Sequence, residues 1–200
     1  MLNEEKIKVM IRKEKVKLLL SRVKEIYTIG DDLGHPNILE KAKWKEESIG
    51  AELGHTVFSK STGDVKGADA LDENGKAWEY KTQELNTFKD VLRFFESVVD
   101  GTNTFAGSMT YNNGYSRENV NSYKDIGHIH GVFFRGDMLA ITEVSTDYVT
   151  SDNGLMKRVI KEENGKKYKS TNGNGVGVHY ENGGVRNGEG KVVFIDDIRK

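Results

Sequence analysis

The architecture of this chain follows from the segment Gly67-Ala-Asp-Ala-Leu-Asp-Glu-Asn-Gly-Lys-Ala-Trp-Glu-Tyr-Lys-Thr82. It predicts a tight β-hairpin, because two strand-like runs flank the turn-forming residues Asn74 and Gly75. Side chains along a strand alternate between the two faces of a sheet, so Glu79 and Lys81 share one face. The hairpin therefore gathers charged side chains on one surface.

The length of the turn determines whether Asp69 joins them. A two-residue turn at Asn74-Gly75 places Asp69 opposite Tyr80, on the other face. A three-residue turn that ends at Gly75 places Asp69 opposite Glu79 instead, and it requires a positive φ at Gly75. A site with both carboxylates therefore predicts the three-residue turn.

Two facing carboxylates repel each other, and a bound divalent cation reverses that repulsion. Mg²⁺ prefers hard oxygen ligands and takes only one or two protein carboxylates, which leaves positions for waters and a phosphate. Lys81 can hold or deprotonate the attacking water and balance charge on the phosphate. Asp69, Glu79 and Lys81 are therefore candidate catalytic residues of a Mg²⁺-dependent nuclease. The alternative is an ordinary exposed hairpin face.

The hairpin residues Gly67-Ala-Asp69-Ala-Leu-Asp72, Asn74-Gly75-Lys and Glu79-Tyr-Lys81-Thr also resemble a known motif. They are similar to the active-site hairpin of PD-(D/E)XK restriction endonucleases, most of all of the PvuII type. The segment from Ile129 to Val144 resembles the strand-turn-strand that follows the active site in those enzymes.

That resemblance implies an α/β fold with a restriction-endonuclease-like mixed central sheet flanked by helices. It implies a homodimer that cuts both strands of duplex DNA at a short palindrome with Mg²⁺. It also implies that Asp69, Glu79 and the backbone carbonyl of Tyr80 ligate the metal and that Lys81 is catalytic. Two alternatives stay open: a structure-selective repair or recombination nuclease of the same fold, and a DNA-binding module without catalysis.

Residues 101–125 are rich in groups that hydrogen-bond base edges. Asn pairs with adenine and Arg with guanine in the major groove. The candidate DNA contacts are Asn112, Asn113, Tyr115, Ser116, Arg117 and Asn119. The alternative is a polar surface loop and a short helix capped by Ser116. Because this segment stands where PvuII-type enzymes have a His-rich one, the recognition sequence stays open.

Two helices are predicted before the hairpin. Apolar residues at helical spacing over 4–27 predict a long amphipathic helix that packs on its own domain or on a second copy of the chain. Gly30, Asp31, Asp32, Gly34 and Pro36 break this pattern. A second helix is expected over 37–53, stopped by Gly54. Its acidic residues are surface charges or further acids for the metal site; they are Glu46, Glu47 and Glu52.

Further elements are expected on either side of the motif. Strands are predicted over 55–60, 66–72 and 76–82, a helix over 88–99, and core strands over 132–134 and 138–141 joined at Arg135-Gly136-Asp137. His128 and His130 are expected to cap a strand or approach DNA rather than hold zinc. Val176-Gly-Val-His-Tyr180 and Lys191-Val-Val-Phe-Ile195 are predicted strands in a Gly-rich tail whose hairpins flank the DNA.

Composition agrees with a single nuclease domain over 1–200: a helical part at 1–30 that can dimerise, a catalytic core at 37–145 and a hairpin-rich part at 146–200. The 200 residues are 36% hydrophobic, enough for one sizeable core. The absence of cysteine excludes thiolate metal sites and suits the cytoplasm. No membrane segment and no nucleotide-binding P-loop is expected. The net charge is only −1, so phosphate contacts depend on local Lys and Arg groups.

Overall fold

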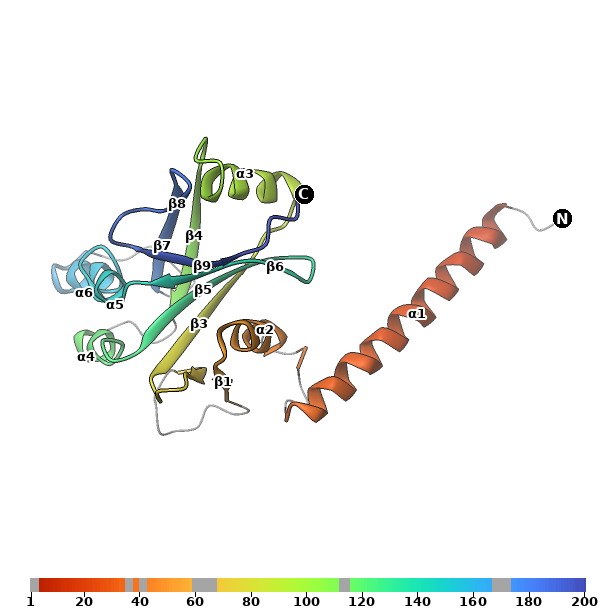
Figure 1. The fold of residues 1–200 in the computed structure, drawn as a ribbon, viewed down its shortest axis with the longest axis horizontal. Coiled ribbons are helices and arrows are strands. Elements are labelled where there is room, and N and C mark those ends of the chain that lie inside the picture. The colour runs from red at the N-terminus through yellow and green to blue at the C-terminus, as the bar shows by residue number, and fades with distance from the viewer. Residues whose placement is uncertain (1–3, 35–37, 40–42, 59–67, 112–115, 167–173) are drawn as a thin grey trace. The chain divides into compact units, whose positions relative to one another are not determined.

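The computed structural model describes residues 4–34, 38–39, 43–58, 68–111, 116–166 and 174–200 (Figure 1). The chain divides into two units, Met1–Trp44 and Lys45–Lys200. Each unit is described by itself. The hairpin-rich residues from 146 onward lie in the same unit as the predicted catalytic hairpin.

The first unit contains one long helix, α1 (Glu4–Asp32), which runs past the predicted end at residue 27. The predicted amphipathic character is wrong, because apolar residues are hardly concentrated on one face of the helix. The helix passes the predicted break at Gly30 and Asp31, because one glycine costs a helix only about 1 kcal/mol. It is terminated at Gly34, whose φ is 76°, a conformation that favours glycine. Leu18 and Leu19 are exposed by 59% and 60%. In the described part of the chain, no helix has both the length and the apolar character that a bilayer crossing demands.

The second unit is built on a six-stranded sheet, here called sheet A, with strand order β1-β2-β3-β5-β6-β9. β3 and β5 are parallel, and every other neighbouring pair is antiparallel. The sheet is therefore mixed, as predicted. Its strands are β1 (Thr56–Val57), β2 (Ala70–Leu71), β3 (Ala77–Glu84), β5 (Gly127–Phe134), β6 (Asp137–Val144) and β9 (Gly190–Ile195).

The described residues of the connection from β3 to β5 include α3 (Phe88–Val98), β4 (Thr104–Tyr111) and α4 (Arg117–Asn121). The predicted helix over 88–99 is confirmed. Thr87 caps it, because its hydroxyl accepts the backbone N–H of Asp90 at 3.2 Å while the Asp90 carboxylate accepts the N–H of Thr87 at 3.1 Å.

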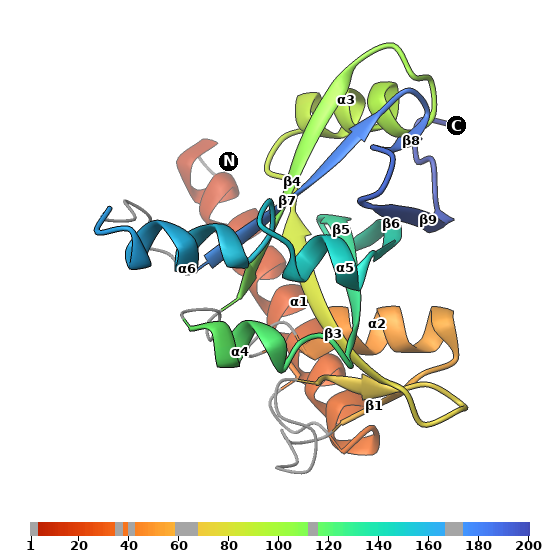
Figure 2. The same ribbon diagram turned by 90° about the vertical axis from the view of Figure 1, so that its left-hand side faces the viewer.

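A second sheet, sheet B, has the order β4-β7-β8 and is antiparallel throughout. β7 spans Asn174–Glu181 and β8 spans Gly184–Val185. The expectation of one polar segment over 101–125 is wrong for 104–111. Those residues form β4, with buried Gly107, Met109 and Tyr111 alternating with exposed residues. Figure 2 shows β4 and β7 side by side, with α3 next to them.

The core lies between the two sheets. Tyr180 of β7 bonds to His130 of β5 and Thr142 of β6. The opposite face of sheet A is covered by α2 (Lys43–Leu53). A Cβ added at Gly131 would lie 2.7 Å from the side chain of Ile49. Sheet A is therefore enclosed on both faces around β5, whose residues are all buried.

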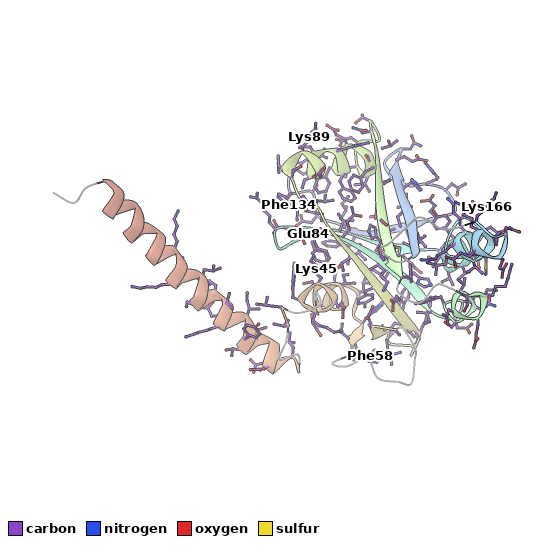
Figure 3. All side chains as sticks on the ribbon, turned by 180° about the vertical axis from the view of Figure 1, so that it is seen from behind. Lys45, Phe58, Glu84, Lys89, Phe134 and Lys166 are labelled. Carbon is purple, nitrogen blue, oxygen red and sulfur yellow. The ribbon has the colours of Figure 1, made fainter. Side chains whose placement is uncertain are left out.

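Helix α2 begins at Lys43, later than the predicted residue 37, because Ile38 and Leu39 form a turn. Its end at Leu53 is as predicted, and Gly54 follows with a φ of 71°. Lys45 of α2 pairs with Glu84 at the end of β3 at 2.6 Å (Figure 3). This pair fastens the helix to the strand that carries the motif.

The strands predicted over 55–60 and 66–72 occur as the short β1 and β2, and residues 59–60 and 66–67 of these predictions lie outside the described residues. The turn between β5 and β6 has positive φ at Arg135 (52°) and Gly136 (102°), as suits a tight hairpin. Both predicted tail strands occur, as β7 and β9. Among the described residues between β6 and β7 are the short helices α5 (Thr146–Thr150) and α6 (Met156–Glu163).

Candidate active site

The β2–β3 hairpin has the register that a two-carboxylate site requires. Ala70 pairs with Trp78 and Leu71 with Ala77. Asp69 directly precedes these paired residues, and its charge acts on Glu79, so the two carboxylates lie near each other. Gly75 closes the turn with a φ of 79°. The three-residue turn is therefore confirmed, and the two-residue alternative is excluded.

The turn is held by Asp72. Its Oδ1 accepts the backbone N–H groups of Asn74 and Lys76, each at 2.9 Å, and its Oδ2 accepts Trp78 Nε1–H at 3.2 Å. Partial desolvation opposes ionisation of Asp72, but these hydrogen bonds outweigh it and hold its pKa below the usual value. Asp72 therefore builds the turn and points away from the acid pair.

Asp69 is fixed across the hairpin by its own backbone and side chain. Its N–H donates to the carbonyl of Trp78 at 2.8 Å, and its Oδ2 accepts the N–H of Tyr80 at 2.7 Å. The N–H and C=O of one strand residue point to the same edge. The Tyr80 carbonyl, predicted to be a metal ligand, therefore lies on the same edge of β3 as Asp69.

Glu79 and Lys81 contact each other on the face of β3 that looks toward sheet B, Lys81 Nζ donating to Glu79 Oε1. Their side chains are only 8% and 21% exposed. Burial is the main reason that the pKa of Glu79 is raised to about 7; the charges of Asp69 and Glu46 raise it further, and Lys81 opposes them. The surroundings of Glu79 thus disfavour its negative charge unless a further cation is present.

This donor set suits a hard cation. Asp69 and Glu79 both supply carboxylate oxygens. A positive ion near both would offset the cost of burying the negative charge of Glu79 and its repulsion by Asp69, which are the two largest causes that raise the pKa of Glu79. Within the described ranges, no three or more His, Cys, Asp or Glu side chains come together as a metal site. A cation here would depend on these two carboxylates, backbone oxygen and water.

Helix α2 brings acidic residues to the other side of β3. Burial is the main cause that raises the pKa of the Tyr80 phenol, followed by the negative charges of Asp69, Glu46 and Glu47. The charge of Glu46 also raises the pKa of Glu79. Glu46, one of the three acids of α2 that the sequence analysis considered for the metal site, therefore raises the pKa of Glu79.

The predicted DNA-contacting residues fall into two groups. Asn112, Asn113 and Tyr115 lie outside the described residues. The others have structural partners, since the Ser116 hydroxyl accepts the N–H of Asn119 at 3.1 Å and so caps α4. Arg117 forms two hydrogen bonds to the carboxylate of Glu163, at 2.7 and 2.6 Å, and joins α4 to α6. Contact with DNA by any of them stays a prediction.

The expectation that His128 and His130 approach DNA is wrong. Both are fully buried between the sheets. His128 Nδ1 lies 3.1 Å from the Tyr111 hydroxyl, and His130 Nδ1 lies 2.8 Å from the Tyr180 hydroxyl. Burial lowers the pKa of each imidazole to about 4. The histidines are therefore neutral bridges between sheet A and sheet B.

Sequence reasoning missed the residues that sheet B contributes beside the motif. Tyr111 lies beneath Lys81, whose Nζ is 5.1 Å from the ring centroid. Its position at the end of an alternating run, Phe105 to Tyr111, was the available signal for a strand. No local pattern indicates that this strand lies beside β3 of the hairpin.

Comparison with known proteins adds no relative. No protein-family model matches the chain, and none of the curated proteins matches its sequence. Conclusions about activity rest on the hairpin and its surroundings.

Proposed function

We propose that this protein is a Mg²⁺-dependent endonuclease that hydrolyses duplex DNA, of the type II restriction kind. The observation that supports the proposal is the β2–β3 hairpin, in which Asp69 accepts the backbone N–H of Tyr80 and its charge acts on Glu79, while Lys81 donates to Glu79. Two carboxylates and a lysine in this arrangement suit phosphodiester hydrolysis.

In the proposed mechanism, Asp69, Glu79 and the Tyr80 carbonyl would hold Mg²⁺, which would supply Lewis acidity to the phosphate and its attacking water. Asp69 is kept in place by the Tyr80 N–H. Lys81 Nζ, held beside Glu79, donates a hydrogen bond to the water or to a phosphate oxygen. Its positive charge balances the charge that builds on the phosphate.

The proposal extends to the assembly and its location. Cleavage of both strands at a palindrome requires two catalytic hairpins related by a two-fold axis, and so a homodimer. Restriction of incoming DNA would take place in the cytoplasm. The exposed leucines of α1, Leu18 and Leu19, are available for a self-association surface.

The first prediction concerns Lys81→Ala. It removes the group that positions water and balances charge, so we expect cleavage of unmethylated plasmid and phage DNA to fall by about 10²- to 10⁴-fold. The measurement is Mg²⁺-dependent formation of discrete fragments, with the ends mapped by sequencing and EDTA as the metal-free control.

Lys76→Ala is the matched control, because Lys76 lies in the same hairpin with its Nζ 4.1 Å from the centroid of the Trp78 ring and outside the proposed site. It is expected to cleave at the wild-type rate. Cleavage without a preferred sequence would favour a structure-selective nuclease. Binding of DNA without any cleavage across varied substrates would contradict the proposal and favour a non-catalytic module.

A further inference from the structure

Lys81 has a second partner besides Glu79, and it comes from the other sheet. Its Nζ lies 5.1 Å from the centroid of the Tyr111 ring at the end of β4. A lysine head on a flexible stem loses considerable rotamer freedom when it is fixed in one place. Contacts with a carboxylate and with an aromatic ring restrict it from two directions.

The Tyr111 ring is itself held by hydrogen bonds. Its hydroxyl lies 3.1 Å from His128 Nδ1, and His128 Nε2 lies 3.2 Å from the backbone carbonyl of Tyr123. A carbonyl can only accept, so the proton of the neutral imidazole is on Nε2. His128 Nδ1 is then the acceptor, and the Tyr111 hydroxyl donates to it. This chain of bonds fixes the position of the hydroxyl end of the Tyr111 ring.

Packing around Tyr111 leaves it no alternative position. The residue is fully buried, and the ring of Tyr123 meets it edge-on with centroids 5.1 Å apart. Burial, together with the negative charge of Glu79, raises the pKa of its phenol. The ring is therefore an uncharged π surface, which attracts an ammonium without neutralising it as a second carboxylate would.

We propose that Tyr111 is a positioning residue for Lys81: its ring face holds the ammonium beside Glu79, and His128 holds the ring. This inference rests on the proposed catalytic role of Lys81. It assigns the Tyr111–His128 pair of β4 and β5 to the reaction, although neither residue needs to touch DNA.

A kinetic test compares Tyr111→Leu with Tyr111→Phe in Mg²⁺-dependent DNA cleavage. Loss of the ring should lower kcat by about 2- to 30-fold, which corresponds to a cation–π contact of about 0.5–2 kcal/mol, with KM unchanged. Phenylalanine keeps the ring face and should restore most of that loss, although it lacks the hydroxyl. Wild-type kcat in Tyr111→Leu, or no rescue by phenylalanine, would overturn the inference.

A second test does not depend on cleavage. A proton above an aromatic face resonates upfield, so the Lys81 ε-methylene signal should be shifted upfield in protein labelled with ¹³C-lysine. The signal is assigned by its loss in Lys81→Ala. It should persist in Tyr111→Phe and move to the ordinary lysine position in Tyr111→Leu.

The two tests separate the two proposals. An upfield signal in a wild-type protein that cuts no DNA would contradict the proposed nuclease function and support the Lys81–Tyr111 contact. DNA cleavage by a protein whose Lys81 signal is at the ordinary lysine position would support the nuclease function and overturn the positioning role of Tyr111. The wild-type spectrum decides this even if Tyr111→Leu does not fold.

Discussion

Glu79 is a carboxylate whose surroundings oppose its own ionisation. It is 6% exposed, and burial raises its pKa to about 7 in spite of Lys81. Its folded-state pKa thus lies above the ordinary value of 4.5. Below pH 4.5 it is protonated in both states, whereas between pH 4.5 and 7 only the unfolded state loses the proton readily. The free energy of unfolding therefore falls through that window as pH rises.

Glu79→Gln should remove this dependence. Glutamine cannot ionise. From pH 4.5 to pH 7.5 in EDTA, the free energy of unfolding of the variant should therefore rise by about 2–3 kcal/mol relative to that of wild type. Urea unfolding at the two pH values measures the change. The buried histidines act in the opposite sense, since their lowered pKa values, about 4, cost stability as pH falls from 6.5. Both proteins share that effect, so it cancels.

Magnesium provides the control for the same experiment. Added at pH 7.5, it should stabilise wild type because it binds the ionised acid pair in the folded state. It should have a much smaller effect on Glu79→Gln. Equal pH dependence in the two proteins would contradict the burial argument, and equal stabilisation by Mg²⁺ would contradict the metal site.

The β2–β3 hairpin is the element in which local sequence and local structure agree best. Its three-residue turn depends on Gly75, whose φ is 79°. No heavy atom lies within 4 Å of a Cβ built there. The cost of a side chain at this position is therefore purely backbone strain.

Gly75→Ala should lower the free energy of unfolding by about 1–2 kcal/mol, the usual cost of a left-handed conformation for a residue with a Cβ. It should also weaken Mg²⁺-dependent cleavage, because the turn sets the register of the two strands that position Asp69 and Glu79. Gly184→Ala is the matched control: a Cβ at this position likewise meets nothing within 4 Å, but the φ of Gly184 is not positive. A strand alanine there should be neutral or stabilising.

Helix α4 offers a way to separate structure from recognition. The Arg117–Glu163 pair joins α4 to α6, but its side chains are 58% and 47% exposed. An exposed pair contributes only about 0–1 kcal/mol to stability. A large effect of Arg117 on DNA binding therefore cannot come from unfolding.

Arg117→Ala is expected to change the free energy of unfolding by less than about 1 kcal/mol and to weaken specific DNA binding by about 1–3 kcal/mol if the residue reads guanine. Fluorescence anisotropy with labelled duplexes measures the binding. Glu163→Ala breaks the same pair but leaves the arginine, so it should bind DNA as wild type does. Equal losses in both variants would reduce Arg117 to a structural role.

At the scale of the second unit, two buried Tyr–His pairs connect sheet A with sheet B. Tyr111 bonds to His128, and Tyr180 bonds to His130 and to Thr142. Among the described side chains, His130 Nε2 is the buried polar atom without a hydrogen-bond partner. Gly107 permits the approach of β4, because a Cβ there would lie 2.5 Å from the ring of His130.

Tyr180→Phe should destabilise the unit by about 1–3 kcal/mol, because it leaves His130 without its remaining partner. Thermal or urea unfolding measures the loss. Tyr148→Phe is the control: its half-buried hydroxyl donates to the carbonyl of Gly177 at 2.7 Å and also interacts with Glu189, but it makes no contact with His130. Equal losses in the free energy of unfolding of the two variants would contradict a larger contribution of the Tyr180–His130 hydrogen bond to stability.

The sequence by itself determined the local elements. Strand alternation, the turn residues and Gly75 predicted the hairpin and its three-residue turn, and the positions of α3, β5, β6, β7 and β9 followed from apolar patterning. Each of these depends on neighbours within a few positions along the chain, and such interactions can be read from spacing.

Only the tertiary structure decided which of these elements meet. Residues 104–111 pair with 174–181, and that pairing covers β5, buries both histidines and brings Tyr111 under Lys81. Hydrogen-bond partners some fifty residues apart, such as His130 and Tyr180, leave no periodic trace in sequence. The raised pKa of Glu79 belongs to this level as well, because it results from burial beneath a second sheet and not from the Glu-Tyr-Lys motif.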